Sequence, residues 1–239
     1  GGGGDGFRLE GEGPGPRRRA RSLYVLDATG RSRWVARRCG SRSVESYDRQ
    51  IAIVADLRPL SSASLSAALL LEACETGWWY SVPTPGDRAV AAFITDADLL
   101  VEAQKPEALW LQALKTSRHT QERLAGSRAE SVRVQASGTS RLRDPAGRGW
   151  AAIGDAAMVF DPLSSSGIMK ALRTGVNVAR DLAHAGATSD LVLPGYRERC
   201  DEEFAEYYKT LRWFYAKEQR WPRSPFWQRR HEWLIARGP

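Results

Sequence analysis

The sequence has few cysteines and histidines, and it has no long apolar run. Its three cysteines, Cys39, Cys74 and Cys200, are odd in number and far apart, which argues against a disulfide framework and a paired-cysteine metal site. The three histidines have no spacing that suits a metal ion. We therefore expect reduced thiols and no metal centre.

No apolar stretch approaches the roughly 18 residues of a membrane-spanning helix, and the glycine-rich, then basic beginning lacks the apolar block of a signal peptide. These absences predict a cytoplasmic protein. The net charge is +7, but the basic residues are spread along the chain without a stripe or a recognisable motif. We therefore expect neither a nucleic acid nor a membrane as partner.

What the sequence does contain is the alternating patterning of a globular α/β (α+β) protein of 239 residues, enough for one large or two small domains. A short apolar strand at 23–26 ends in an Asp-Ala-Thr-Gly turn, and its continuous apolar character is typical of a strand buried on both faces of a parallel sheet. A second strand begins at Ile51 and ends at Pro59.

The middle of the chain predicts an antiparallel meander over 65–106, then one amphipathic helix over 106–126 and a strand over 130–137. Near the C-terminus, a helix should last until Gly186, and a long helix should start at Tyr196 and break near Trp221.

Glycines at the very beginning, in "GGGGDG", formally match the GxGxxG pattern of dinucleotide-binding proteins. That fingerprint must follow a strand and open a helix. Here no strand precedes the glycines, and a short strand with a Gly/Pro turn follows them. We interpret the match as a loop.

The segment "GWAAIGDAAMVFDPLSSSGIMKALRTG", at 149–175, carries more turn residues than a strand-to-helix connection requires. Gly154 permits close approach of a ligand to the backbone, Asp155 offers a carboxylate to hydroxyl groups, and 164–167 place a helix N-terminus beside them. An ordinary capped helix after a strand would also explain the spacing. Lys170, just inside the helix, could contact a bound ligand, but we expect a solvated lysine.

Two motifs in this order resemble a known family. "GDAAMVFDPLSSSGI" is similar to the second FAD motif of flavoprotein monooxygenases with the para-hydroxybenzoate hydroxylase fold, and "LYVLDATGR" to their upstream Asp-Ala-Thr-Gly segment. "GWWYSVPTP", "AAFITDADL" and the aromatic tail "RWFYAKEQRWPRSPFWQRRH" resemble the tryptophan-halogenase-like branch, in particular the flavoproteins that hydroxylate peptidyl tryptophan during quinone cofactor biogenesis.

The resemblance implies FAD as cofactor and a division of the chain into four parts. These are a partial FAD-binding domain of Rossmann-like, three-layer type at 1–50, an antiparallel-sheet substrate domain at 51–137, the rest of the FAD-binding domain at 138–188, and a helical, aromatic-rich region at 189–239. Family members begin with a strand-GxGxxG-helix unit, so the resemblance also implies a C-terminal fragment of such an enzyme.

Site residues follow from the resemblance position by position. Asp155, with Gly154, would bind hydroxyl groups of FAD, and Asp27 and Gly30 would lie near its adenosine half, although Asp27 is equally interpreted as a turn residue. The flavin ring would be faced by the following residues: Pro162, Ser164, Ser165, Ser166, Gly167 and Ile168.

Trp78, Trp79 and Tyr80 are candidates for the substrate pocket, but strand alternation sends Trp79 to the face opposite the other two. Tryptophans on a sheet are also more often part of the core. No catalytic acid or base is evident.

The implied activity is hydroxylation of an electron-rich aromatic group through a flavin C4a-hydroperoxide, with a tryptophan side chain as a candidate substrate, either in an aromatic small molecule or in a polypeptide. Electrons would come from NAD(P)H or from a separate flavin reductase. Two alternatives stay open. One is a flavin-dependent halogenase or another FAD-dependent oxidoreductase. The other is a truncated, non-catalytic protein that binds a partner through exposed tryptophans of the tail: Trp213, Trp221, Trp227 and Trp233.

Overall fold

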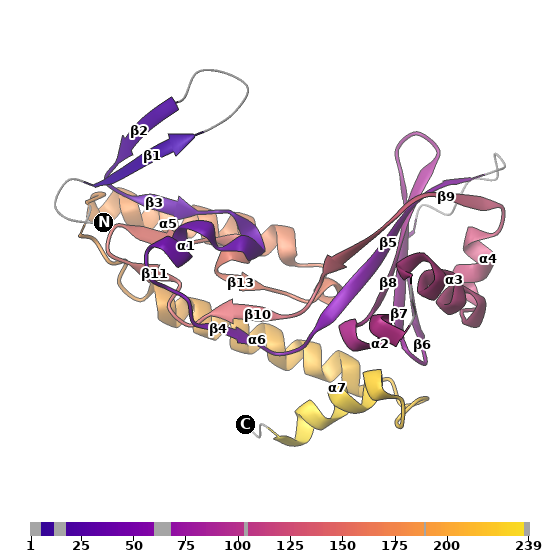
Figure 1. Ribbon diagram of the computed structural model, residues 1–239. Coiled ribbons are helices and arrows are strands. Elements are labelled where there is room, and N and C mark those ends of the chain that lie inside the picture. The colour runs from indigo at the N-terminus through magenta and orange to yellow at the C-terminus, as the bar shows by residue number, and fades with distance from the viewer. Residues whose placement is uncertain (1–5, 12–17, 60–67, 103–104, 189, 237–239) are drawn as a thin grey trace. The chain divides into compact units, whose positions relative to one another are not determined.

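The computed structural model describes residues 6–11, 18–59, 68–102, 105–188 and 190–236. The chain forms two compact units: unit 1 comprises 1–47 and 139–208, and unit 2 comprises 48–138 and 209–239. Each unit is therefore assembled from segments far apart in the sequence. Figure 1 labels the helices and strands of both units.

Unit 1 contains small sheets and both short and long helices. A projecting hairpin pairs β1 (Phe7–Gly11) with β2 (Arg18–Ser22). One three-stranded sheet has the order β11 (Ala146–Gly147), β12 (Trp150–Ala152), β3 (Val25–Asp27), and the other has the order β13 (Met158–Val159), β10 (Ser140–Leu142), β4 (Val44–Ser46). β3 and β12 run parallel. The helices of this unit are α1 (Trp34–Arg38), α5 (Gly167–Ala185) and the first part of α6 (Tyr196–Ala216).

The parallel pairing of β3 with β12 confirms the type of sheet predicted there, but β3 is not buried on both faces. In β3, Val25 and Asp27 are buried, whereas Leu26 is 36% exposed. Leu23, which the prediction placed in the strand, lies before β3 and is 53% exposed. β3 also lies at the end of its sheet, with β12 as its neighbour among the described strands. The apolar sequence predicts a strand packed on both faces and paired at both edges, whereas within the described residues β3 is packed on one face and paired at one edge.

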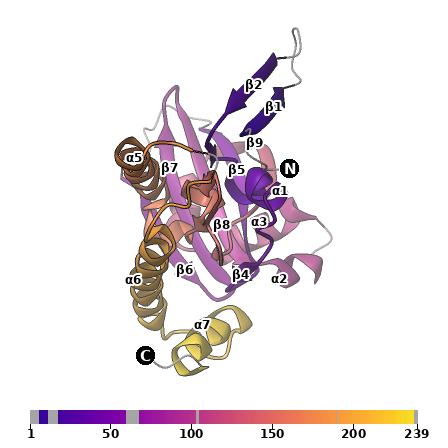
Figure 2. The same ribbon diagram turned by 90° about the vertical axis from the view of Figure 1, so that its left-hand side faces the viewer.

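Unit 2 is built on a five-stranded antiparallel sheet (Figure 2). Its strand order is β6 (Leu70–Cys74), β7 (Gly77–Thr84), β8 (Arg88–Asp96), β5 (Gln50–Pro59), β9 (Ser127–Ala136). Three helices lie along one side of it: α2 (Ala97–Glu102), α3 (Pro106–Thr116) and α4 (His119–Leu124) (Figure 1). The sheet confirms the predicted meander, in which hairpins connect β6, β7 and β8.

Two helices of unit 2 differ from the expectation. The sequence predicts an antiparallel sheet over 65–106, but the chain turns into α2 after Asp96. The single helix predicted over 106–126 is divided between α3 and α4. The carboxylate of Glu72 accepts hydrogen bonds from the backbone nitrogens of Arg118, His119 and Thr120 and thereby starts a new helix. The contact with Glu72 in strand β6 therefore interrupts the helical periodicity of 106–126.

The C-terminal region ends in α7 (Pro225–Ala236), which belongs to unit 2 and buries Phe226, Trp227 and Arg230. α6 ends at Ala216, before the break predicted near Trp221. Trp227, expected to be exposed, is only 3% exposed, and its indole nitrogen donates to the carbonyl oxygen of Cys74 at 2.8 Å. Trp213 is 55% exposed, Trp221 is half-buried, and the side chain of Trp233 is outside the described residues.

The three cysteines are free thiols in the structure. Cys200 is buried in unit 1 and Cys74 is buried in unit 2, while Cys39 is half-buried. Burial raises the pKa of Cys74 and of Cys200 to about 12 each. At neutral pH both thiols are therefore protonated and unreactive in the folded chain.

Candidate functional site

The Gly154-Asp155 segment lies in unit 1, where β12 leads into a single 3-10 turn, Gly154–Ala156. Gly154 has a φ of +58°, and a Cβ added to it would lie 3.1 Å from the Cβ of Ala171 in α5. Its backbone nitrogen donates to the hydroxyl of Thr174, also in α5, at 2.9 Å. Glycine is required here because the turn has a left-handed conformation and packs directly on the helix.

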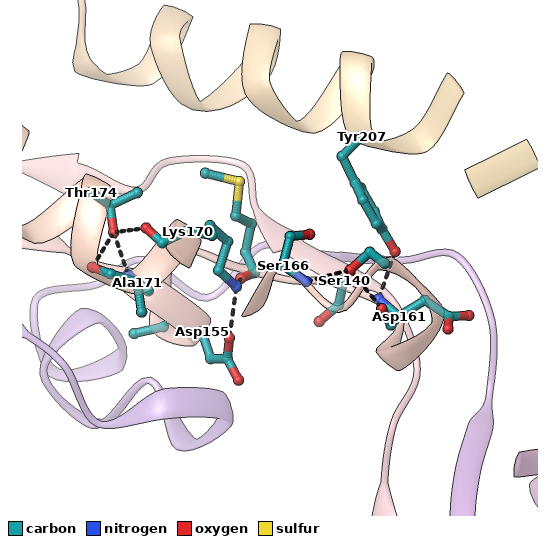
Figure 3. Close-up of polar contacts among 12 residues, drawn as sticks. Ser140, Asp155, Asp161, Ser166, Lys170, Ala171, Thr174 and Tyr207 are labelled. Carbon is teal, nitrogen blue, oxygen red and sulfur yellow. Dashed lines mark hydrogen bonds and ion pairs between the residues drawn. The ribbon is translucent and has the colours of Figure 1, made fainter. Parts of the chain in front are cut away.

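Asp155 places its carboxylate at the edge of this turn. One oxygen, Oδ1, accepts a hydrogen bond of 2.6 Å from the ammonium group of Lys170, and the other points away from it (Figure 3). The Asp155 side chain is 45% exposed. A carboxylate with one oxygen fixed and the other accessible suits a ligand that carries hydroxyl groups.

Lys170 is fully buried, which contradicts the expectation of a solvated lysine. Its ammonium group also donates to the carbonyl oxygen of Met158 and lies 4.6 Å from the ring centroid of Phe160. Burial lowers the pKa of Lys170, and the hydrogen bond to Asp155 partly offsets that effect. Three partners thus compensate a charge that would otherwise be costly to enclose.

The loop before α5 is held by local hydrogen bonds. Asp161 accepts from the backbone nitrogen of Leu163 at 2.8 Å and so caps a 3-10 turn, Pro162–Ser164. Ser165 has a φ of +50°, in the left-handed region, and Ser166 then takes the N-cap position of α5 without a capping side-chain hydrogen bond. The helix therefore presents its first backbone N–H groups without a side-chain cap.

The resulting helix N-terminus lies in the same segment as Asp155, and it is the one predicted from the serines. α5 begins at Gly167, and its second residue, Ile168, is 79% exposed. The helix ends at Ala185 with Gly186 as C-cap, as predicted. Two apolar residues of α5 one turn apart, Leu172 and Val176, face outward, with exposed fractions of 60% and 49%.

Asp27 does not present an accessible carboxylate. It is fully buried, and its oxygens accept from the backbone nitrogens of Thr29 and Ala36 and from the hydroxyl of Thr29. This geometry favours the interpretation of Asp27 as a turn residue. Gly30 has a φ of +65° and no neighbouring atom within 4 Å of an added Cβ, so the space beside it is open.

The three aromatic residues of β7 are divided between the two faces of the sheet, in agreement with the alternation. Trp79 is fully buried and packs on Phe93 and Trp110, with ring centroids 5.0 and 5.2 Å away. Trp78 is on the other face with Tyr80, 6.2 Å between centroids, and its indole nitrogen donates to the hydroxyl of Tyr215 at 3.0 Å. Trp79 is part of the core, while Tyr80 is half-buried.

Two side chains that sequence reasoning missed support the site. Arg33, 5% exposed, donates to the carbonyl oxygen of Ala156 at 3.1 Å and to the hydroxyl of Ser140 at 2.9 Å. Tyr207 in α6 stacks on Phe160 with centroids 3.8 Å apart. Neither belongs to a local motif, so no signal in the sequence marks them.

A separate cavity of about 1020 Å³ lies elsewhere in unit 1, between the β1–β2 hairpin and α1. Its lining includes Arg8, Arg21, Trp34 and Trp150 but not Asp155 or the loop before α5. Among the described residues, no cluster of three or more metal-binding side chains occurs. A search of the same residues finds no helix with the length and apolarity to cross a membrane.

Comparison with protein-family models finds no match. Two curated relatives are similar in sequence. One, from Marinomonas mediterranea, is named as an FAD-dependent oxidoreductase, LodB, and is 32% identical over 215 residues, 87% of this chain and 56% of the relative. The other, a 1H-pyrrole-2-carbonyl-[peptidyl-carrier protein] brominase of Pseudoalteromonas luteoviolacea, is 26% identical over 75% of this chain and 46% of its own length. The chain thus spans about half the length of the curated relatives that it matches.

Solved structures share the fold. The flavin-dependent halogenase CmlS matches with a TM-score of 0.81 and 23% identity over 95% of this chain and 43% of its own. The peptidyl tryptophan dihydroxylase QhpG, essential for tryptophylquinone cofactor biogenesis, matches with a TM-score of 0.66 and 20% identity over 92% and 51%. The predicted fold class and the resemblance to flavoproteins are thereby confirmed. The chain shares the fold of the matching parts of the flavin-dependent halogenase CmlS and of QhpG, and the two curated relatives are named as an FAD-dependent oxidoreductase and a brominase.

Proposed function

We propose that the protein containing this chain is an FAD-dependent monooxygenase that hydroxylates an electron-rich aromatic group. The observation that carries the proposal is the half-exposed carboxylate of Asp155, held by Lys170 in the segment that leads to the uncapped N-terminus of α5. Carboxylate oxygens and helix N-termini suit, respectively, the hydroxyl groups and the electron-rich ring of a flavin. The residues present therefore fit the flavin half of FAD.

In this proposal each residue has a binding role. The accessible oxygen of Asp155 accepts a hydrogen bond from a ribityl or ribose hydroxyl. The first backbone N–H groups of α5, with the residues from Ser164 to Ile168, face the pyrimidine side of the ring and stabilise negative charge there. Gly154 keeps the turn close to the helix so that both elements reach the same ligand. Bound FAD supplies the redox chemistry and the activation of oxygen.

For the substrate we propose a tryptophan side chain, in a small molecule or in a polypeptide. This is supported by the shared fold with a peptidyl tryptophan dihydroxylase and by the sequence similarity to LodB. Halogenation is the second candidate, because one curated relative is a brominase and a halogenase has the same fold. Electrons would come from NAD(P)H or from a separate flavin reductase. The free thiols support the cytoplasm as the place of action.

The test uses the full-length protein that contains this chain. Its visible spectrum after purification is expected to show bound flavin. The reaction is run with a reductant and with tryptophan or a tryptophan-bearing polypeptide as substrate. Mass spectrometry should show that each inserted oxygen adds about 18 mass units to the substrate under ¹⁸O₂ and about 16 under ordinary O₂. A halide-dependent mass gain instead of oxygen incorporation would favour halogenation. A protein that binds no flavin would refute both.

A further inference from the structure

The surroundings of Lys170 point to a role beyond packing. A lysine with no exposed surface is rare, because enclosing an ammonium group in a protein interior is costly. Its nearest partner, Asp155, is the residue that the proposed function assigns to the cofactor, at 2.6 Å. The other two partners, the carbonyl oxygen of Met158 and the ring of Phe160, fix the ammonium group from the inner side.

We propose that Lys170 is a positioning residue, which holds the carboxylate of Asp155 in the orientation that presents its second oxygen to a hydroxyl group of FAD. The inference rests on the proposed function, since it concerns the same site. Without the ammonium group, Asp155 at 45% exposure is free to turn into solvent or to point both oxygens away from the ligand.

The location of Lys170 in α5 allows it to orient the carboxylate of Asp155. It lies in the first turn of α5, so the helix that faces the flavin ring in the proposed function also fixes the group that binds its hydroxyls. Thr174, one turn later, accepts from the backbone nitrogen of Gly154 at 2.9 Å. Two side chains on one face of α5 therefore hold both the backbone and the carboxylate of the Gly154-Asp155 turn. Figure 3 shows the contact between Lys170 and Asp155.

A double-mutant cycle on the full-length protein tests the inference, with FAD affinity as the readout and the melting temperature as the check on folding. The variants are Asp155→Ala, Lys170→Met and the pair together. Each single substitution is expected to weaken FAD binding about tenfold, the range for loss of one charge-assisted hydrogen bond. The double variant is expected to bind FAD no more weakly than Asp155→Ala, because Lys170 acts through Asp155.

A matched control separates positioning from packing. Val178 is fully buried on the same face of α5, two turns beyond Lys170. Val178→Ala should lower the melting temperature and leave FAD affinity unchanged. If Lys170→Met does not fold, Lys170→Gln, which keeps a hydrogen-bond donor without the charge, takes its place in the cycle.

Two results would overturn the inference while leaving the proposed function intact. One is wild-type FAD affinity in Lys170→Met when Asp155→Ala binds weakly. The other is a loss from Lys170→Met that persists in full in the Asp155→Ala background, which would indicate a structural role. Unchanged affinity in Asp155→Ala would refute the role of both residues in a protein that still binds FAD. Absence of flavin from the wild-type protein would instead count against the proposed function itself.

Discussion

The phenol oxygen of Tyr207 lies 2.6 Å from the backbone nitrogen of Asp161 and accepts its hydrogen bond. Helix α6 thereby holds the loop that leads into α5, even though the two residues are 46 positions apart in the chain. The same phenol oxygen lies 3.1 Å from the hydroxyl of Thr139. The orientation of the helix N-terminus at the candidate site thus depends on a side chain outside the site's own motif.

Tyr207→Phe should therefore destabilise the protein. The stacking on Phe160 is kept, but the buried N–H of Asp161 loses its acceptor, a cost of about 1–3 kcal/mol in the free energy of unfolding. Urea denaturation of the full-length protein measures it. The control is Tyr24→Phe, because the buried hydroxyl of Tyr24 has no hydrogen-bond partner among the described residues and its loss should be neutral or stabilising. Equal destabilisation by the two substitutions would contradict this prediction.

Two glycines of the same region should respond to alanine in opposite directions. Gly154→Ala forces a side chain into a left-handed conformation 3.1 Å from Ala171, and we expect a loss of about 1–3 kcal/mol together with weaker FAD binding. Gly175 is inside α5 and has one neighbour, the Cδ1 of Ile153, at 3.8 Å. Gly175→Ala should stabilise the helix by about 0.5–1 kcal/mol. Thermal unfolding and flavin titration of both variants provide the comparison, and a stable Gly154→Ala variant would show that the turn can adopt another conformation.

Acid should weaken the start of α4 through Glu72. Burial alone would raise the pKa of this carboxyl, but hydrogen bonds from Thr120 and from the backbone nitrogens of Arg118, Thr120 and His119 outweigh it, so that its pKa is lowered. A lowered pKa in the folded state means that the stabilisation is complete above the ordinary pKa of glutamate and is lost as the pH falls through the folded value.

Glu72→Gln should thus cost about 1 kcal/mol at neutral pH, a typical value for loss of a helix cap, and the difference from wild type should shrink in acid. Denaturant midpoints measured at a series of pH values below 5 or so give this difference. Glu122→Gln provides the matched control, because the Glu122 side chain is 68% exposed and lies 3.9 Å from Arg118. A constant difference between Glu72→Gln and wild type at all pH values would exclude the ionised cap as its cause.

Residues 1–239 produced alone should not retain FAD at one molecule per chain. The described residues offer Asp155 and the N-terminus of α5, but they contain no glycine-rich strand-turn-helix to hold the two charges of a pyrophosphate. The edge of β3 that has no neighbour among the described strands, together with the exposed Leu23, should also promote self-association. Size-exclusion chromatography with excess FAD tests both points. A monomeric peak with one flavin per chain would show that the affinity resides in these residues.

Much of the fold could be predicted because the local patterns were strong. The alternation of β7 placed Trp79 opposite Trp78, and Gly186 marked the end of α5. The Gly154-Asp155 motif located the candidate site, although its ligand role stays a prediction. These features depend on residues close together in the sequence, where spacing determines geometry.

The errors occurred where a distant residue decides the outcome. Glu72 divides a helix that its own periodicity predicts as continuous, and the sequence shows no link between the two segments. Lys170 has the spacing of a surface lysine, and only the convergence of Asp155, Met158 and Phe160 makes a buried position acceptable. The buried face of α5 carries Lys170, Thr174 and Val178, whereas the more apolar face is exposed. Hydrophobicity alone predicts the opposite orientation of the helix.

Each unit contains one buried thiol, whose rate of alkylation would measure how often that unit opens. Cys200 lies in unit 1 and Cys74 in unit 2. Each thiol can ionise and react with an alkylating reagent only after the surrounding structure opens, because burial raises its pKa and blocks access. Pulsed labelling followed by peptide mass spectrometry would therefore report two opening rates in a single experiment. If the units open independently, the two peptides gain label at different rates, and a substitution such as Glu72→Gln changes the rate at Cys74 alone.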